Sequence, residues 1–237
     1  MEADRPAGGP PPSPQFGAEG LLAASGGRPP QVEPVFRAPW PPLAISALIL
    51  VCYLGQTQAA EPVALMQRFG FSPSDMAHGR WGGLITALFV HGNWPHAILN
   101  ALGALAFGAP VARLLGTRAG GAAAFFGFYL LCGALASLGF AALHVGDSAV
   151  LVGGSGAIAG LMGAASRLLE RRNMLSPFTS RAVMSMAAAW LAVNLVFALF
   201  GLNLGAGNAP VAWEAHLIGY AVGLLLIGPL ARVMKRV

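Results

Sequence analysis

The chain has very little charge for its length. Charged residues make up 10% of its 237 residues, whereas a soluble domain carries about 25%. Hydrophobic residues make up 56% of the chain and are gathered in blocks. A bilayer core of about 30 Å is crossed by a helix of roughly 20 mostly apolar residues, and several blocks approach that length. The composition argues against a soluble protein and predicts one embedded in a lipid bilayer.

Cysteine and lysine are also scarce. Cys52 and Cys132 both lie inside apolar runs, where free cysteine behaves as a small hydrophobe, so neither a disulfide nor a metal site is expected. The net charge of +5 comes from fourteen basic residues, of which only Lys235 is a lysine. Most of them lie at the ends of apolar segments, which reflects membrane topology and not a nucleic-acid-binding surface. We therefore expect no nucleic-acid partner and no metal or other cofactor.

The first part of the chain differs in composition from the rest. Residues 1–40 are rich in Pro, Gly and Ala and cannot bury enough apolar surface to fold, so they predict a disordered cytoplasmic tail. They do not resemble a signal peptide, because no short apolar core with a cleavage site follows a basic start. A membrane domain is predicted over residues 41–237, with its first helix beginning after Pro41 and Pro42.

Six apolar segments predict an all-α bundle of six transmembrane helices, over residues 43–60, 95–112, 120–143, 155–169, 183–205 and 212–231. The basic residues support this count, because cytoplasmic loops are enriched in Lys and Arg. If the N-terminus is cytoplasmic, only Arg68 and Arg80 fall on the outer side. The inner side then collects Arg113, Arg118, Arg167, Arg171, Arg172, Arg181, Arg232, Lys235 and Arg236. Both termini are therefore predicted to be cytoplasmic.

The half-apolar outer loop of residues 61–94 is predicted to lie in the interface or to dip back into the membrane.

Polar side chains within the predicted membrane region are costly and therefore indicate function. They are His91, His96, Asn100, Ser155 and His216. Counting back from the inner arginines at 1.5 Å per helical residue, the last four lie about 18 to 25 Å above the cytoplasmic edge. Three helices thus bring polar groups to one level, and a site at that depth requires a water-filled cavity.

Ser155 follows two glycines, Gly153 and Gly154, which permit an unusual loop backbone. A helix beginning there places Ser155 at its positive end, where free backbone N–H groups can hold an oxyanion. Ser155 considered alone is equally compatible with a small residue in a packing face.

Glycines at four-residue spacing accompany both Ser155 and His216. They are Gly156 and Gly160 after the serine, and Gly219 and Gly223 after the histidine. Such small faces let two helices approach closely, which would bring Ser155 within reach of His216. A serine is a weak nucleophile until a base takes its proton, and histidine titrates in the useful range.

His96 and Asn100 are four residues apart and share one face of the predicted second helix. Pro95 suits the first turn of that helix and Asn93 suits its cap. Both His96 and Asn100 can donate a hydrogen bond to a developing negative oxygen.

Three segments resemble the signature segments of rhomboid proteases: HGNWPHAILN (residues 91–100), GGSGAIAGLMGA (153–164) and AHLIGYAVG (215–223). They occur in the family's order on the second, fourth and sixth predicted helices, and the resemblance covers about residues 43–235. It implies that Ser155 is the nucleophile and His216 the base of a Ser-His dyad. It also implies an oxyanion hole formed by His96, Asn100 and the Ser155 backbone N–H, with His91 as a structural histidine.

The sequence departs from the family's pattern in the outer loop and beside the serine. Gly83 stands where many rhomboids have the arginine of a Trp-Arg pair, so the anchor of the outer loop is not predicted. Ala159 stands where some members have an aromatic residue that stacks on the base. Glu214 lies near the outer interface, so no carboxylate completes a triad and a dyad is expected. Asn194 is a sixth polar residue in the membrane region with a weaker claim to function, and it is interpreted as forming a packing hydrogen bond beside Trp190 on the fifth predicted helix.

The function expected from these features is intramembrane serine endopeptidase activity on transmembrane protein substrates, with cleavage in or near their membrane segments. One alternative is an inactive rhomboid-like protein that binds membrane clients, although such proteins usually lack the serine or the histidine. Another is a small proton-coupled transporter, although the inverted repeats typical of transporters are not visible.

The short loops suit a bacterial inner membrane, with an organellar membrane as the alternative. His78 and His144 are expected to be solvated, and the oligomeric state is not predicted.

Overall fold

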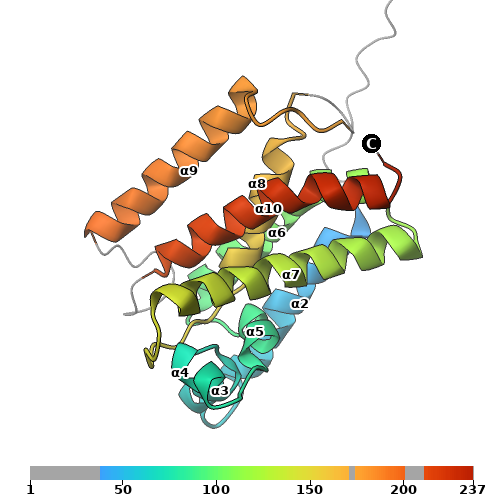
Figure 1. The fold of residues 1–237 in the computed structure, drawn as a ribbon. Coiled ribbons are helices and arrows are strands. Elements are labelled where there is room, and N and C mark those ends of the chain that lie inside the picture. The colour runs from blue at the N-terminus through green and yellow to red at the C-terminus, as the bar shows by residue number, and fades with distance from the viewer. Residues whose placement is uncertain (1–37, 171–173, 201–210, 237) are drawn as a thin grey trace, which may run out of the picture. The chain divides into compact units, whose positions relative to one another are not determined.

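The computed structural model describes residues 38–170, 174–200 and 211–236. Helices are the regular elements of this part of the chain, and five of them are long and apolar enough to span a membrane. These five are α2 (Trp40–Thr57), α6 (Trp94–Leu115), α7 (Ala119–Leu143), α9 (Arg181–Phe200) and α10 (Trp213–Val233). A shorter apolar helix, α8 (Ser155–Ser166), follows α7 (Figure 1). The predicted tail of residues 1–40 lies, except for its last three residues, outside the described residues.

The predicted helices and the observed ones agree to within a few residues, with two differences. The first helix begins at Trp40 and not after the two prolines, because Pro41 and Pro42 occupy its first turn. Backbone N–H groups of a first turn have no partner within the helix, so proline, which lacks the N–H, costs nothing there. The predicted fifth helix extends to residue 205, and its last five positions lie outside the described residues. The cap predicted for the second helix is present, since the Asn93 side chain accepts a hydrogen bond from the His96 backbone N–H at 2.8 Å.

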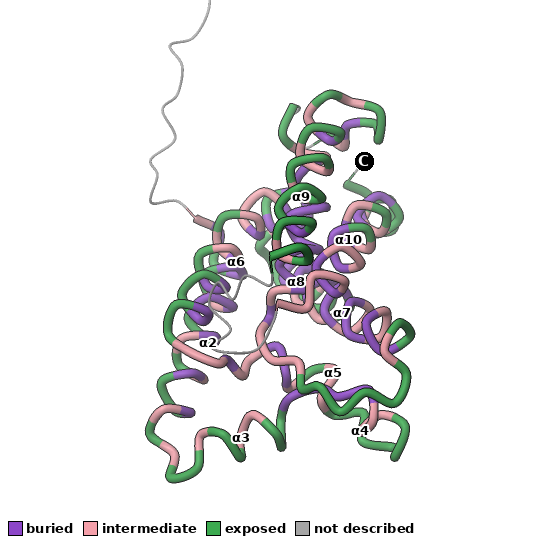
Figure 2. The backbone as a smooth tube through the Cα atoms, turned by 90° about the vertical axis from the view of Figure 1, so that its left-hand side faces the viewer, coloured by how far each residue is buried: buried purple, intermediate pink, exposed green. Residues whose placement is uncertain are grey.

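Helix α8 is too short to be a membrane span by itself. Its 12 residues give a length of roughly 18 Å, against a bilayer core of about 30 Å. Every residue from Gly156 to Ser166 is buried, and α8 packs against α6, α7, α9 and α10. Figure 2 shows this central helix enclosed by the others. Its apolar composition therefore reflects contact with protein, and the non-helical segment before Ser155 is tolerated because neighbouring helices surround it.

Glycines bring α8 and α10 into backbone contact. A β-carbon at Gly219 would overlap the carbonyl oxygen of Gly156, and one at Gly223 would overlap the carbonyl oxygen of Gly160. This approach places the second turn of α10 beside the first turn of α8.

The outer loop is folded into three short helices and a 3-10 turn: α3 (Pro62–Phe69), α4 (Pro73–Ala77), α5 (Gly83–Thr86) and η1 (Ala87–Phe89). They gather at one end of the long helices (Figure 1). An antiparallel bridge between Phe71 and Leu151 ties this loop to the segment that precedes Ser155. Gly83 packs on Gly70 so closely that a β-carbon would lie 2.5 Å from the Gly70 carbonyl oxygen. The backbone at position 83, where the sequence resemblance would suggest an arginine, therefore lies directly against Gly70.

Basic residues gather at the other end of the helices. Arg113 lies in the last turn of α6 and Arg232 in the last turn of α10. Arg167 follows the end of α8 and donates from Nε to the Ser176 carbonyl oxygen at 3.0 Å. Burial, and then the nearby charge of Arg232, lower the pKa of Arg167. This clustering of positive charge is typical of the cytoplasmic side of a membrane protein.

Candidate active site

Ser155 and His216 lie side by side where α8 and α10 meet. The Ser155 Oγ atom is 2.8 Å from the Nε2 atom of His216. Ser155 is the first residue of α8, so the backbone N–H groups of this first turn have no partner within the helix. His216 is buried, with 9% of its surface exposed. A hydroxyl group, an imidazole ring and free backbone N–H donors therefore lie together at the N-terminus of α8.

His96 approaches this point from α6. The backbone of Gly153 has a φ of +101°, a conformation that favours glycine. A β-carbon at Gly153 would lie 2.5 Å from the Nε2 atom of His96. Gly153 is therefore required both for the turn into α8 and for the close approach of the His96 ring. The Nδ1 atom of His96 has no hydrogen-bond partner among the described residues.

Asn100 lies one turn further along α6, on the same face as His96. Its Nδ2 atom donates to the His96 carbonyl oxygen at 2.8 Å, and its buried Oδ1 atom has no partner within the described part of the chain. An amide nitrogen carries two N–H groups, so one donor remains. His96 lies against Gly153, two residues before Ser155, and Asn100 follows it on the same face of α6. Each carries a buried polar atom without a partner among the described residues.

His91 lies outside this cluster and is fully buried. Gln56 of α2 holds its backbone, donating from Nε2 to the His91 carbonyl oxygen at 2.8 Å and accepting from the His91 N–H at 3.1 Å. The His91 ring packs edge to face against His96, with 5.0 Å between ring centroids. Burial, and then the neighbouring His96, lower the pKa of His91 to about 3. These contacts describe a neutral histidine that packs against the ring of His96.

Helix α9 contributes two side chains to His216 that the sequence did not assign to the site. Asn194 is fully buried, and its Oδ1 atom lies 3.2 Å from the Nδ1 atom of His216. The indole ring of Trp190 lies beside the imidazole, with 5.8 Å between centroids. The aromatic neighbour of His216 thus comes from α9, and Trp190 packs in the same apolar cluster as Ala159 of α8. The sequence feature that could have indicated both residues is a polar amide four residues after a tryptophan within an apolar segment.

His78 and His144 lie between helices and differ in their surroundings. His78 is exposed, as expected. His144 is only partly exposed, with 32% of its side chain accessible, because its ring stacks on Phe140 with 4.1 Å between centroids. Its Nε2 atom lies 3.2 Å from Glu214 Oε1, which joins the end of α7 to the start of α10.

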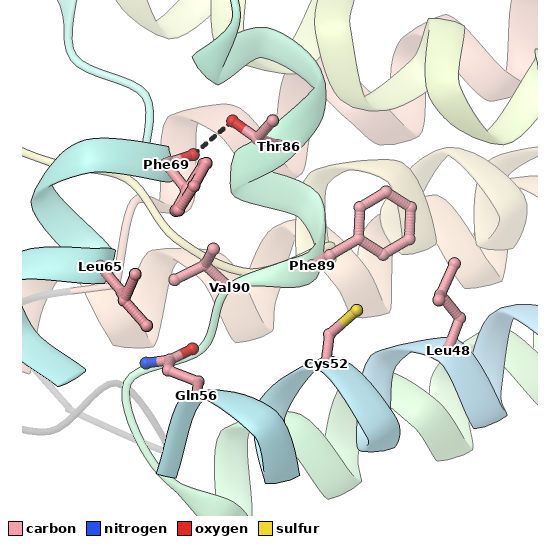
Figure 3. A pocket seen from close by; sticks show the side chains of 8 residues that line it. All are labelled: Leu48, Cys52, Gln56, Leu65, Phe69, Thr86, Phe89 and Val90. Carbon is pink, nitrogen blue, oxygen red and sulfur yellow. Dashed lines mark hydrogen bonds between the residues drawn. The ribbon is translucent and has the colours of Figure 1, made fainter. Parts of the chain in front are cut away.

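An apolar cavity of about 350 Å³ lies between α2 and the outer loop (Figure 3). Its polar lining groups are already occupied: Gln56 bonds the backbone of His91, and Thr86 donates to the Phe69 carbonyl oxygen at 2.6 Å. The lining residues are Leu48, Cys52, Gln56, Leu65, Phe69, Thr86, Phe89 and Val90. Neither Ser155 nor His216 borders this cavity, so it is separate from the cluster described above.

The helices and this buried polar cluster define an integral, multi-pass membrane protein. Comparison with protein families gives the particular class, because the model of the rhomboid domain matches residues 78–233. This range includes all three signature segments and covers well over half of the chain, so the protein belongs to the rhomboid family. None of the curated proteins matches the chain significantly.

Proposed function

We propose that this protein is an intramembrane serine endopeptidase that cleaves peptide bonds in or near the transmembrane segments of other membrane proteins. The observation that carries the proposal is the 2.8 Å contact between Ser155 Oγ and His216 Nε2 at the N-terminus of α8. Membership of the rhomboid family supports it, since rhomboids are usually proteases of this kind.

The proposed reaction begins with Ser155 Oγ attacking the scissile carbonyl carbon while His216 Nε2 takes the hydroxyl proton. The negative oxygen that forms accepts hydrogen bonds from the Ser155 N–H and from the side chains of His96 and Asn100. His216 then gives its proton to the leaving amine. A water molecule, deprotonated by His216, releases the acyl group from Ser155. The scissile bond must be locally unwound to reach Ser155, because a helical segment holds its carbonyl groups in internal hydrogen bonds.

A fluorophosphonate probe tests the proposal directly, because it labels an activated serine covalently. We expect mass spectrometry of the protein in liposomes to place the adduct on Ser155, together with cleavage of a labelled transmembrane substrate. Ser155→Ala should abolish both. Ser166→Ala should leave both intact, because that hydroxyl lies at the far end of α8 and donates to the Gly163 carbonyl oxygen.

Absence of both labelling and cleavage in the unmodified protein would contradict the protease proposal and favour an inactive rhomboid-like protein that binds clients. Cleavage by Ser155→Ala at the original rate would contradict the assigned nucleophile.

We also propose six membrane crossings with both termini in the cytoplasm, and a bacterial inner membrane as the location. In this topology α8 and the segment before it together make the fourth crossing. The basic residues at the ends of α6, α8 and α10 support the orientation. A reporter enzyme that works only in the cytoplasm should be active when fused after residue 237. Activity of a reporter that works only on the outer side would contradict this topology.

A further inference from the structure

Asn194 makes contacts with the base that a packing residue does not need. It is fully buried on α9, and an amide inside a membrane protein is costly unless its polar atoms are satisfied. Its Nδ2 atom donates to the Trp190 carbonyl oxygen at 2.8 Å, which satisfies one of its two N–H groups within its own helix. Its Oδ1 atom lies 3.2 Å from His216 Nδ1. We propose that Asn194 is a positioning residue that fixes the ring orientation and tautomer of His216, an inference that rests on the proposed protease function.

The orientation of the Asn194 amide follows from its two neighbours. Turning the amide over would place Oδ1 against the Trp190 carbonyl oxygen, so that two acceptors would face each other. The observed orientation gives the carbonyl oxygen a donor and leaves Oδ1 facing His216. Asn194 therefore presents an acceptor to the ring of His216.

An acceptor at this position determines where His216 carries its proton. A neutral imidazole has one N–H and one bare nitrogen, and the contact with Oδ1 is a hydrogen bond only if Nδ1 carries the hydrogen. The bare nitrogen is then Nε2, which lies 2.8 Å from Ser155 Oγ. This is the tautomer that can accept the serine proton. Asn194 thus takes the part that a carboxylate or amide takes in other His-dependent hydrolases.

The same contact persists through the proton transfer. When the proton leaves Ser155 Oγ for Nε2, the ring becomes an imidazolium that carries N–H groups on both nitrogens. The Nδ1–H group continues to donate to Asn194 Oδ1, and the neutral amide neither gains nor loses a proton. Trp190 lies beside the ring and donates from Nε1 to the backbone carbonyl oxygen of His216 at 3.4 Å, so two side chains one turn apart hold the base.

Helix α9, which carries Asn194 and Trp190, is the least buried of the long helices described. Val183 and Asn194 are its buried residues, and most of its other residues are exposed (Figure 2). The orientation of His216 therefore depends on the helix that, among the five long helices described, has the least contact with the other helices.

The test compares two replacements of similar size. Asn194→Asp keeps an acceptor oxygen for His216 and, when protonated, an O–H donor for the Trp190 carbonyl oxygen, whereas Asn194→Leu keeps the shape and removes both. We expect Asn194→Leu to lower kcat for a transmembrane substrate in liposomes by about 10-fold with KM nearly unchanged, as expected for the loss of one neutral hydrogen bond. Asn194→Asp should retain kcat within about 3-fold, on the same reasoning. Val183→Ala, at the other buried position of α9, controls for a general loosening of the helix and should not separate kcat from KM.

A merely structural role predicts the opposite order, with Asn194→Leu as active as the original protein, and that result would overturn the proposal. An equal loss in both folded variants would overturn it too. If neither variant folds, the tautomer is decided by ¹⁵N NMR of the original protein with labelled histidine, using His216→Ala to assign the signal. A proton on Nδ1 supports the proposal, and a proton on Nε2 refutes it. If Ser155 is not labelled by the probe, the protease function fails, and the NMR result still decides the hydrogen bond.

Discussion

Replacing His216 with alanine is expected to reduce cleavage as completely as replacing Ser155, by on the order of 10⁴-fold or more. The two residues form one proton-transfer unit, because Ser155 Oγ lies 2.8 Å from His216 Nε2. Without the imidazole, the serine hydroxyl keeps its proton at neutral pH and is a weak nucleophile. The measurement is kcat/KM for a labelled transmembrane substrate in liposomes, for both single variants and the double variant. The double variant should be no slower than either single variant, since residues that act as a unit are not additive.

His78→Ala is the matched control for this prediction. His78 is an exposed histidine in the outer loop, and its ring bonds the Ser74 carbonyl oxygen. Its replacement should leave kcat/KM within about 2-fold, because the ring is far from the reaction and surface substitutions usually change the free energy of unfolding by no more than about 0.5 kcal/mol. If His216→Ala keeps a tenth or more of the original rate, another group supplies the base. Unequal losses in the two folded single variants by more than about 100-fold would contradict a two-residue proton-transfer unit.

The parts of the site that the sequence could predict are those carried by local patterns. Ser155 stands after two glycines, and His96 and Asn100 stand one turn apart behind a capping Asn93, so each local structure follows from neighbouring residues. The glycine spacings that accompany Ser155 and His216 indicated which two helices meet. Each of these signals lies within about ten residues, the range over which turn, cap and periodicity rules apply.

The contacts that were missed join residues far apart in the chain. Asn194 reaches His216 only because α9 packs on α10, and a single amide in an apolar segment does not reveal that neighbour. The bridge between Phe71 and Leu151 joins residues 80 positions apart, so the anchor of the outer loop had no local sign. Helix α8 was predicted as a membrane span to residue 169, a few residues beyond its end at Ser166, and it is enclosed by other helices. Hydropathy does not distinguish a helix surrounded by lipid from one surrounded by protein.

Replacing Asn100 with leucine is expected to lower kcat by about 100- to 1,000-fold, the usual loss when one oxyanion donor is removed. In the proposed reaction the free N–H of Asn100 Nδ2 donates to the negative oxygen. KM should change little, because this oxygen becomes charged only in the transition state. His96→Ala should lower kcat by a similar factor. It should also destabilise the protein by about 3 kcal/mol, as does removal of other large buried rings, since the His96 ring packs against Gly153 and His91.

The two oxyanion variants should therefore separate activity from stability. Asn100 Oδ1 is buried without a hydrogen-bond partner among the described residues, which costs about 1 to 3 kcal/mol in the folded protein. Leucine removes that cost and keeps the branched shape, at the loss of one hydrogen bond to the His96 carbonyl oxygen, so Asn100→Leu should unfold in detergent at about the same temperature as the original protein or higher. Activity would then fall while stability holds, the relation expected where a buried polar group is kept for catalysis and not for folding. If Asn100→Leu lost stability and kept its kcat, Asn100 would be a packing residue, and the oxyanion hole would consist of the Ser155 N–H and His96 alone.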